Sequence, residues 1–172
     1  MLNTRARILD TARRLFAERG YQDTSVREIA ERLGLTKTAV LYHFPAKADI
    51  LAALAEPFLV DFEAALNSAR TPWETVEAVL DVHLKYRHLL RNNIIKDVAL
   101  LSQAAIARRF AKLMLEANRR VAGPDPDFDE KIRTAQIVAM LSDPVIIYAD
   151  EPPDRLRAAV LNGVRAIARL AD

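Results

Sequence analysis

Apolar residues recur at spacings of three and four along the whole chain, and no segment alternates with a period of two over a useful length. The first pattern places apolar side chains on one face of an α-helix, whereas alternation would place them on one face of a strand. Hydrophobic residues make up 51% of the 172 residues, which is enough to fill a packed core. The sequence therefore predicts an all-α fold.

Turn and cap signals divide the start of the chain into three short helices. The first ends at Gly20, and the second opens with the capping box Ser25-Val26-Arg27-Glu28. Gly34 predicts a tight turn, and a very short third helix begins after Thr36 and stops at Pro45. Two helices joined by a glycine turn, the second short and polar outside, are typical of a helix-turn-helix, whose second helix enters the DNA major groove. The apolar residues expected to share one cluster are Ile8, Ala12, Leu15, Phe16, Val26, Ile29, Ala30, Leu33, Val40 and Phe44.

Longer helices are predicted downstream. Their clearest start signal is Thr71-Pro72-Trp73-Glu74, with an N-cap threonine, a proline at the first helical position and a glutamate at the third. The boundary between two domains is expected inside the fourth helix, which gives a three-helix domain at 1–48 and a larger helical domain at 49–172. The expected helices are 46–70 with a bend near Pro57, 71–91, 94–102, 104–122, 129–149 with a disturbance at Pro144, and 154–171.

The composition excludes several classes of protein. Without cysteine, the chain can form neither a disulfide nor a thiolate metal site. Its longest apolar stretch, IVAMLSDPVIIYA, is interrupted by polar residues and falls short of a membrane span. The start shows no apolar core of a signal peptide, so we expect a cytoplasmic protein that does not enter a membrane. Residues 1–50 carry nine basic against six acidic side chains, a modest excess that favours nucleic acid as a partner.

Enzyme chemistry has weak support in the sequence. Four glycines leave no glycine-rich phosphate loop, and no serine lies in a G-x-S-x-G turn. His83 and His88 are five residues apart, about 140° around a helix, so they cannot share a face as paired metal ligands would. We therefore expect no catalytic residue, no metal site and no cofactor.

The polar residues of the predicted helix-turn-helix suit contacts with duplex DNA. Thr24, Ser25 and the free N–H groups that begin the second helix can bind a phosphate. Arg27 is the candidate for a bidentate contact to guanine. On the third helix, the charge of Lys37 and the hydrogen-bonding groups of Tyr42 and His43 are expected to contact the DNA backbone. Thr38 and Ala39 are small enough to let this helix approach the base edges. The alternative is a helical hairpin that only packs, with Arg27 and Lys37 as solvated charges.

The stretch RILDTARRLFAERGYQDTSVREIAERLGLTKTAVLYHFPAKADIL, from Arg7 to Leu51, resembles the DNA-binding domain of TetR-family transcriptional regulators. The resemblance implies that Arg27 and the five candidates of the third helix contact DNA, with Thr24, Ser25 and Lys47 near phosphates. It implies a repressor that binds an inverted-repeat operator as a homodimer. One departure concerns Leu41, which stands where the family commonly has tyrosine, since the tyrosine here follows at the next position.

The last helix carries a stripe that could form the dimer. Its members share one side of the helix, and an alanine and a glycine among them would let another helix come close. Packing within one chain could use the same face. The stripe comprises Leu156, Ala159, Val160, Gly163, Val164 and Ile167.

A histidine within the apolar stripe of the helix that begins at Pro72 suggests a site for a small hydrophobic effector, the ligand that the resemblance implies. His83 and Tyr86 would supply the polar groups of an otherwise apolar cavity lined by Phe58, Phe62, Leu101, Phe110 and Met114. A core histidine whose partner lies on a neighbouring helix is the alternative. A second function remains open as well, in which the C-terminal part recruits a protein partner instead of binding a metabolite.

Overall fold

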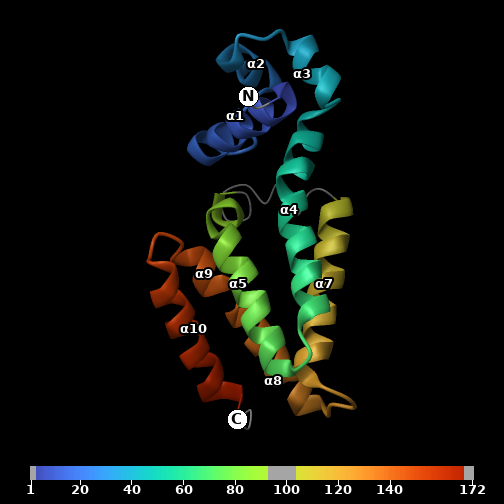
Figure 1. The fold of residues 1–172 in the computed structure, drawn as a ribbon, viewed down its shortest axis with the longest axis vertical. Coiled ribbons are helices and arrows are strands. Elements are labelled where there is room, and N and C mark those ends of the chain that lie inside the picture. The colour runs from blue at the N-terminus through green and yellow to red at the C-terminus, as the bar shows by residue number, and fades with distance from the viewer. Residues whose placement is uncertain (1–2, 93–103, 169–172) are drawn as a thin grey trace. The chain divides into compact units, whose positions relative to one another are not determined.

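The computed structural model describes residues 3–92 and 104–168, and these form helices and loops with no strand among them (Figure 1). The all-α prediction is confirmed. No helix in these two ranges is long and apolar enough to cross a membrane. The helix predicted at 94–102 lies outside the described residues. The helices are α1 Thr4–Arg19, α2 Val26–Leu33, α3 Lys37–His43, α4 Lys47–Ser68, α5 Pro72–Leu90, α7 Ala104–Ala122, α8 Phe128–Met140, α9 Asp143–Ile147 and α10 Pro153–Ala168.

The chain divides into two compact units, and the first comprises Met1–Pro57 and Leu89–Ala107. In this unit α1, α2 and α3 pack around one apolar core to which the start of α4 also contributes. The ring of Phe16 meets that of Tyr21 edge-on, with 5.2 Å between centroids. An ion pair of Arg19 with Glu28 joins α1 to α2. The buried residues of the core are Ile8, Ala12, Leu15, Phe16, Tyr21, Ile29, Ala30, Val40, Phe44, Ile50, Leu51 and Ala55.

Side-chain caps fix where α2 and α3 begin. Ser25 accepts a hydrogen bond from the backbone N–H of Glu28, and Thr36 accepts one from that of Ala39. Between the helices Gly34 adopts a left-handed conformation with φ of 66°. A glycine reaches this region without the steric cost that a Cβ atom brings. The predicted caps and the glycine turn of the helix-turn-helix are therefore confirmed.

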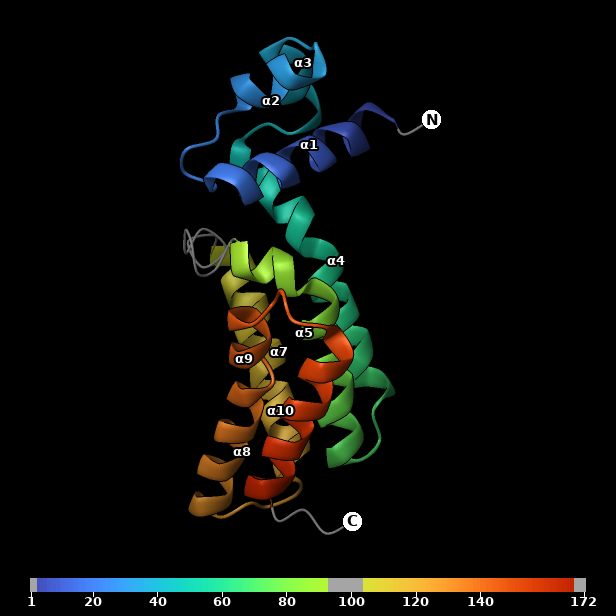
Figure 2. The same ribbon diagram turned by 90° about the vertical axis from the view of Figure 1, so that its left-hand side faces the viewer.

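The second unit comprises Phe58–His88 and Arg108–Asp172, and in it α8, α9 and α10 pack on one another (Figure 2). Arg157 on α10 forms ion pairs with Glu77 and Asp81 on α5. Arg165 stacks over the Trp73 ring, with its guanidinium carbon 4.9 Å from the ring centroid. These contacts hold α10 against α5.

The single helix predicted at 129–149 is wrong, because the chain forms two helices there. α8 ends at Met140, and α9 begins at Asp143 after a turn in which Leu141 N and Ser142 N bond to carbonyls three residues back. Pro144 sits near the start of α9, where its missing N–H removes no helical bond. The proline that disturbs the pattern thus starts a new helix.

Replacing Gly34 by alanine tests the backbone strain in the turn. A Cβ atom at Gly34 meets nothing within 4 Å, so the left-handed φ is the only source of cost. We expect Gly34→Ala to lower the free energy of unfolding by about 1–2 kcal/mol, measured by urea denaturation. Gly34→Asn is the control, because asparagine tolerates this conformation better than alanine. Equal losses for the two variants would contradict the explanation.

Candidate functional site

The outward face of α3 carries most of the predicted DNA-contacting side chains. Val40 is fully buried, which turns the opposite side of this seven-residue helix to the outside. Thr38 and Tyr42 lie there one turn apart, and Tyr42 is 85% exposed. Lys37 at the start of α3 is also exposed, and within the described residues its side chain forms no hydrogen bond or ion pair. At the edge of this face, Ala39 and His43 are half-buried.

On α2 the exposed Arg27 is paired with Glu31 one turn later. The Nε atom of Arg27 donates to Glu31 Oε1 at 2.8 Å, and this hydrogen bond raises the pKa of the arginine. An exposed i,i+4 pair contributes little stability, so Glu31 can exchange for another acceptor at low cost. Arg27 therefore keeps the exposure that a contact with a base requires.

Two residues predicted near phosphates also hold the loop before α2 together. The Thr24 hydroxyl is buried and donates to Gly20 O at 2.8 Å. The Lys47 ammonium donates to Tyr21 O at 2.7 Å, Thr24 O at 2.9 Å and Gln22 O at 3.3 Å. It also lies 4.2 Å from the centroid of the Tyr21 ring. These bonds use the donors of both side chains to shape the loop that presents the start of α2.

The same loop borders a shallow pocket of about 380 Å³ at the start of α2. Three cationic side chains line it against a single acidic one, and the α2 N-terminus lies in its wall. Such a site favours an anion, through both charge and the backbone N–H groups of the first turn. The lining residues are Gln22, Asp23, Thr24, Ser25, Val26, Arg27, Lys37 and Lys47.

The second unit brings five of the seven predicted effector residues into one aromatic cluster. Phe58 lies at the centre, with ring centroids 5.6–5.8 Å from those of Phe62, His83, Tyr86 and Phe110. Phe58, Phe62 and His83 are buried, whereas Tyr86 and Phe110 are half-buried. The cluster joins α4, α5 and α7.

The other two predicted effector residues, Leu101 and Met114, are not members of this aromatic cluster as described. Leu101 lies outside the described residues. Met114 is half-buried on α7, one turn beyond Phe110.

The two polar residues of the cluster differ in their partners. Tyr86 donates its hydroxyl to Asp61 Oδ2 at 2.8 Å, and Asp61 also pairs with Lys85. The Lys85 ammonium, followed by the tyrosine hydroxyl, lowers the pKa of Asp61. His83 bonds through Nδ1 to Val79 O at 2.8 Å, while its Nε2 is buried without a partner among the described residues. Asp61 is a member that the sequence reasoning missed, because its partners lie more than twenty positions away.

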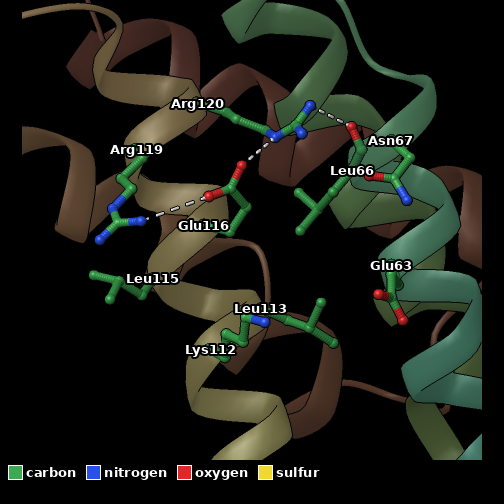
Figure 3. Close-up of a pocket in the computed structure, with 9 residues that line it drawn as sticks. All are labelled: Glu63, Leu66, Asn67, Lys112, Leu113, Leu115, Glu116, Arg119 and Arg120. Carbon is green, nitrogen blue, oxygen red and sulfur yellow. Dashed lines mark hydrogen bonds and ion pairs between the residues drawn. The ribbon is translucent and has the colours of Figure 1, made fainter.

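A pocket of about 400 Å³ lies elsewhere in the second unit, between α4 and α7 (Figure 3). Two of its three cations are already engaged, since Arg120 binds Glu116 and the Leu66 carbonyl and Arg119 also pairs with Glu116. None of the predicted effector residues lines it. The lining residues are Glu63, Leu66, Asn67, Lys112, Leu113, Leu115, Glu116, Arg119 and Arg120.

Most of the predicted dimer stripe on α10 is packed inside the chain itself. Leu156, Val160 and Val164 are buried within the single protomer. A Cβ atom on Gly163 would come 2.9 Å from Cε of Met140, so this glycine faces the chain's own α8. Ala159 and Ile167 are the exposed members of the stripe, and Gly163 is half-buried.

A three-helix unit with a glycine turn and a short, outward-facing polar helix defines a helix-turn-helix protein, joined here to a second helical unit. Residues 8–54 match the family described as "Bacterial regulatory proteins, tetR family". The match lies within the first unit, which therefore has the sequence pattern of that family. The curated relatives described next are named as HTH-type transcriptional regulators or repressors.

The relatives include the transcriptional regulator SrpR of Pseudomonas putida, 37% identical over 83 residues, which cover 45% of this chain and 38% of that protein. TtgW, an uncharacterised regulator of the same species, is 37% identical over 83 residues, or 45% of this chain and 61% of its own. The repressor AcnR of Corynebacterium glutamicum is 43% identical over 53 residues, or 31% and 28%. The match thus spans less than two thirds of each relative.

Solved structures resemble the chain over nearly its whole length. A transcriptional regulator from Aquifex aeolicus has a TM-score of 0.77 at 22% identity, covering 96% of this chain and 99% of that one. A tetR-family regulatory protein from Rhodococcus has a TM-score of 0.69 at 24% identity, covering both chains fully at 100%. At this identity the likeness shows the fold alone, and it extends through both units.

The role of Lys47 can be separated from that of an ordinary surface lysine. Lys47→Met keeps an unbranched side chain as far as Cε but removes the ammonium that binds three carbonyls. We expect it to speed amide hydrogen exchange at residues 21–25 and to lower the free energy of unfolding by about 1–3 kcal/mol. The matched control is Lys37→Met, which should change neither quantity. Unchanged exchange in the Lys47 variant would mean that the loop does not depend on it.

Proposed function

We propose that the protein is a homodimeric DNA-binding transcriptional regulator, a repressor that binds an inverted-repeat operator in the cytoplasm and leaves it when a small hydrophobic effector binds the second unit. The observation that carries this proposal is the outward face of α3, where Lys37, Thr38 and Tyr42 are exposed while Val40 is buried. A helix of this kind presents its outer side chains to the major groove. The relative AcnR, named as a repressor, supports the direction of control.

The two parts of the DNA contact have different tasks in this proposal. The pocket at the start of α2 takes a backbone phosphate, which sets the position of the unit on the duplex without reading sequence. Arg27, Thr38 and Ala39 face the base edges. Lys47 acts at one remove, because its ammonium fixes the loop from which α2 begins.

The proposed partner in the dimer is a second copy bound through α8 and α10. On α8 the exposed apolar residues Phe128, Ile132 and Ala139 follow one another at spacings of four and seven, which puts them on one side of the helix. On α10 the exposed Ala159 and Ala166 are seven apart and leave room for a close neighbour. Exposed apolar stripes of this kind are typical of protein interfaces, and a two-fold axis would pair each stripe with its copy.

The effector is proposed to act through α4. This helix begins with Lys47 and continues to Phe58 and Phe62 of the aromatic cluster, so the same helix carries the lysine that binds the loop before α2 and two rings of the proposed effector site. The effector must bind better to a state with wrongly spaced DNA-binding units, since equal binding to both states shifts nothing. A structure of similar fold from Saccharomonospora viridis, solved in complex with choline, supports small-molecule binding in such a scaffold.

Arginine and lysine variants test the DNA contact, with operators first selected from genomic fragments. Arg27→Ala should cost about 1–3 kcal/mol of binding free energy and relax specificity at one base pair. Lys37→Met should weaken all sequences alike and reduce the slope of log K against log salt by about one, whereas Lys47→Met should weaken binding with little change of slope. Arg119→Ala is the matched control, an exposed arginine of the second unit that is also paired with glutamate. A wild-type protein without any sequence preference would refute the proposal.

A charge on the exposed side of α10 tests the dimer. We expect Ala166→Glu to yield monomers in light scattering at micromolar concentration and to weaken operator binding in parallel, because the two-fold axis brings like charges together. Ala111→Glu on α7, at an alanine that is also exposed, should remain dimeric. Gly163→Leu would be a poor test, since its side chain would displace Met140 in the same chain and so perturb the packing of α8 on α10. A dimer that survives Ala166→Glu would put the interface elsewhere.

A further inference from the structure

The imidazole of His83 has one hydrogen-bonding atom that no described residue satisfies. Its Nδ1 lies 2.8 Å from Val79 O. A carbonyl oxygen only accepts, so Nδ1 carries the proton and donates, and Nε2 is left with a lone pair. That Nε2 is fully buried and has no partner. What the site lacks is therefore a hydrogen-bond donor.

The surroundings of His83 keep it neutral. Burial lowers the pKa of the imidazole, against smaller opposing effects of the Val79 carbonyl and the charge of Asp143. The rings of Phe58 and Phe62 meet it edge-on, at centroid distances of 5.8 and 5.5 Å. A neutral imidazole with this tautomer presents a single acceptor to an otherwise aromatic environment.

The other polar group of the cluster does not compete for the same ligand. The Tyr86 hydroxyl is committed to Asp61, whose carboxylate is compensated by Lys85. A cationic ligand would thus lack an unpaired carboxylate within this cluster, and an anionic ligand would meet a lone pair instead of a donor. Transfer of either charge into an aromatic site without a partner is costly. The ligand that remains is a neutral molecule that donates a hydrogen bond.

We propose that the cluster of Phe58, Phe62, His83 and Phe110 binds a neutral, flat, apolar effector whose one hydroxyl or N–H group donates a hydrogen bond to Nε2 of His83. This inference rests on the proposed function and names the chemical class of its effector. Phe110 is half-buried and packs against Phe58 and Phe62 at 5.8 and 6.3 Å, so it is the ring that the effector displaces as it enters. The aromatic walls then stack on the ligand, while His83 selects for the donor.

A pair of probes with the same ring system, one with a free hydroxyl and one with that hydroxyl capped by a methyl group, tests the proposal. 2-Naphthol has a hydroxyl that 2-methoxynaphthalene lacks, on the same ring system. Titration calorimetry with the 172-residue chain should show 2-naphthol binding about tenfold more tightly, the effect expected when a buried acceptor gains a hydrogen bond. His83→Phe should abolish this preference. Tyr86→Phe is the matched control and should keep it, because its lost hydroxyl faces Asp61.

A second measurement uses the wild-type protein, so that the test of the proposal does not depend on whether His83→Phe folds. In ¹⁵N-histidine-labelled protein, the resonance of the unprotonated Nε2 should move upfield when 2-naphthol is added and stay in place with 2-methoxynaphthalene. Equal affinity for the two probes, no binding of either, or an unmoved Nε2 resonance would overturn the proposal, an internal water then being the partner. Operator binding is measured separately, so its failure would refute the regulator while leaving the ligand assignment intact.

Discussion

A helix of seven residues cannot hold itself together in water, and α3 therefore depends on the core beneath it. Val40 from α3 and Phe44 just after it are buried among residues of α1, α2 and the start of α4. Their burial supplies the stability that so short a helix lacks, while Thr36 caps its start. Because the core fixes the fold of this unit, the outward positions of α3 are not constrained by folding. They can be selected for what they contact.

Local signals were sufficient to predict the helix-turn-helix. Ser25, Thr36 and Gly34 each act within a few residues of their own position, so the sequence around them contains their whole physical cause. The role of Lys47 could not be found this way. Its three acceptors lie 23–26 residues earlier, and only the folded chain brings them to the ammonium. The same applies to Asp61, which meets Lys85 and Tyr86 across two helices.

Helical periodicity identified the apolar face of α10 but not the surface that it meets. Leu156, Val160 and Val164 do form one stripe, and the chain buries that stripe within its own fold. A period of 3.6 residues reports which side of a helix avoids water, whatever covers it. The side left open on α10 is poorer in large apolar residues, which is why the pattern alone did not draw attention to Ala166. Periodicity likewise predicted one helix where the chain forms α8 and α9, because the apolar spacing of α8 continues into α9 past the turn at Ser142.

The hydrogen-bond ladder of α4 is interrupted by Pro57, which lies at the border between the two units. The first segment of the first unit ends at Pro57, and the second unit begins at Phe58. The helix α4 nevertheless runs through both residues. Proline has no N–H, so the carbonyl of Ala53 lacks its helical partner at this point. A helix bends most readily where its hydrogen-bond ladder is interrupted. Phe58 and Phe62, which pack against the Phe110 ring that the proposed effector displaces, thus lie directly after the interrupted turn of α4. On the other side of the proline, at the start of α4, Lys47 donates to two carbonyls of the loop before α2, so the helix that carries these rings is also tied to the DNA-binding unit.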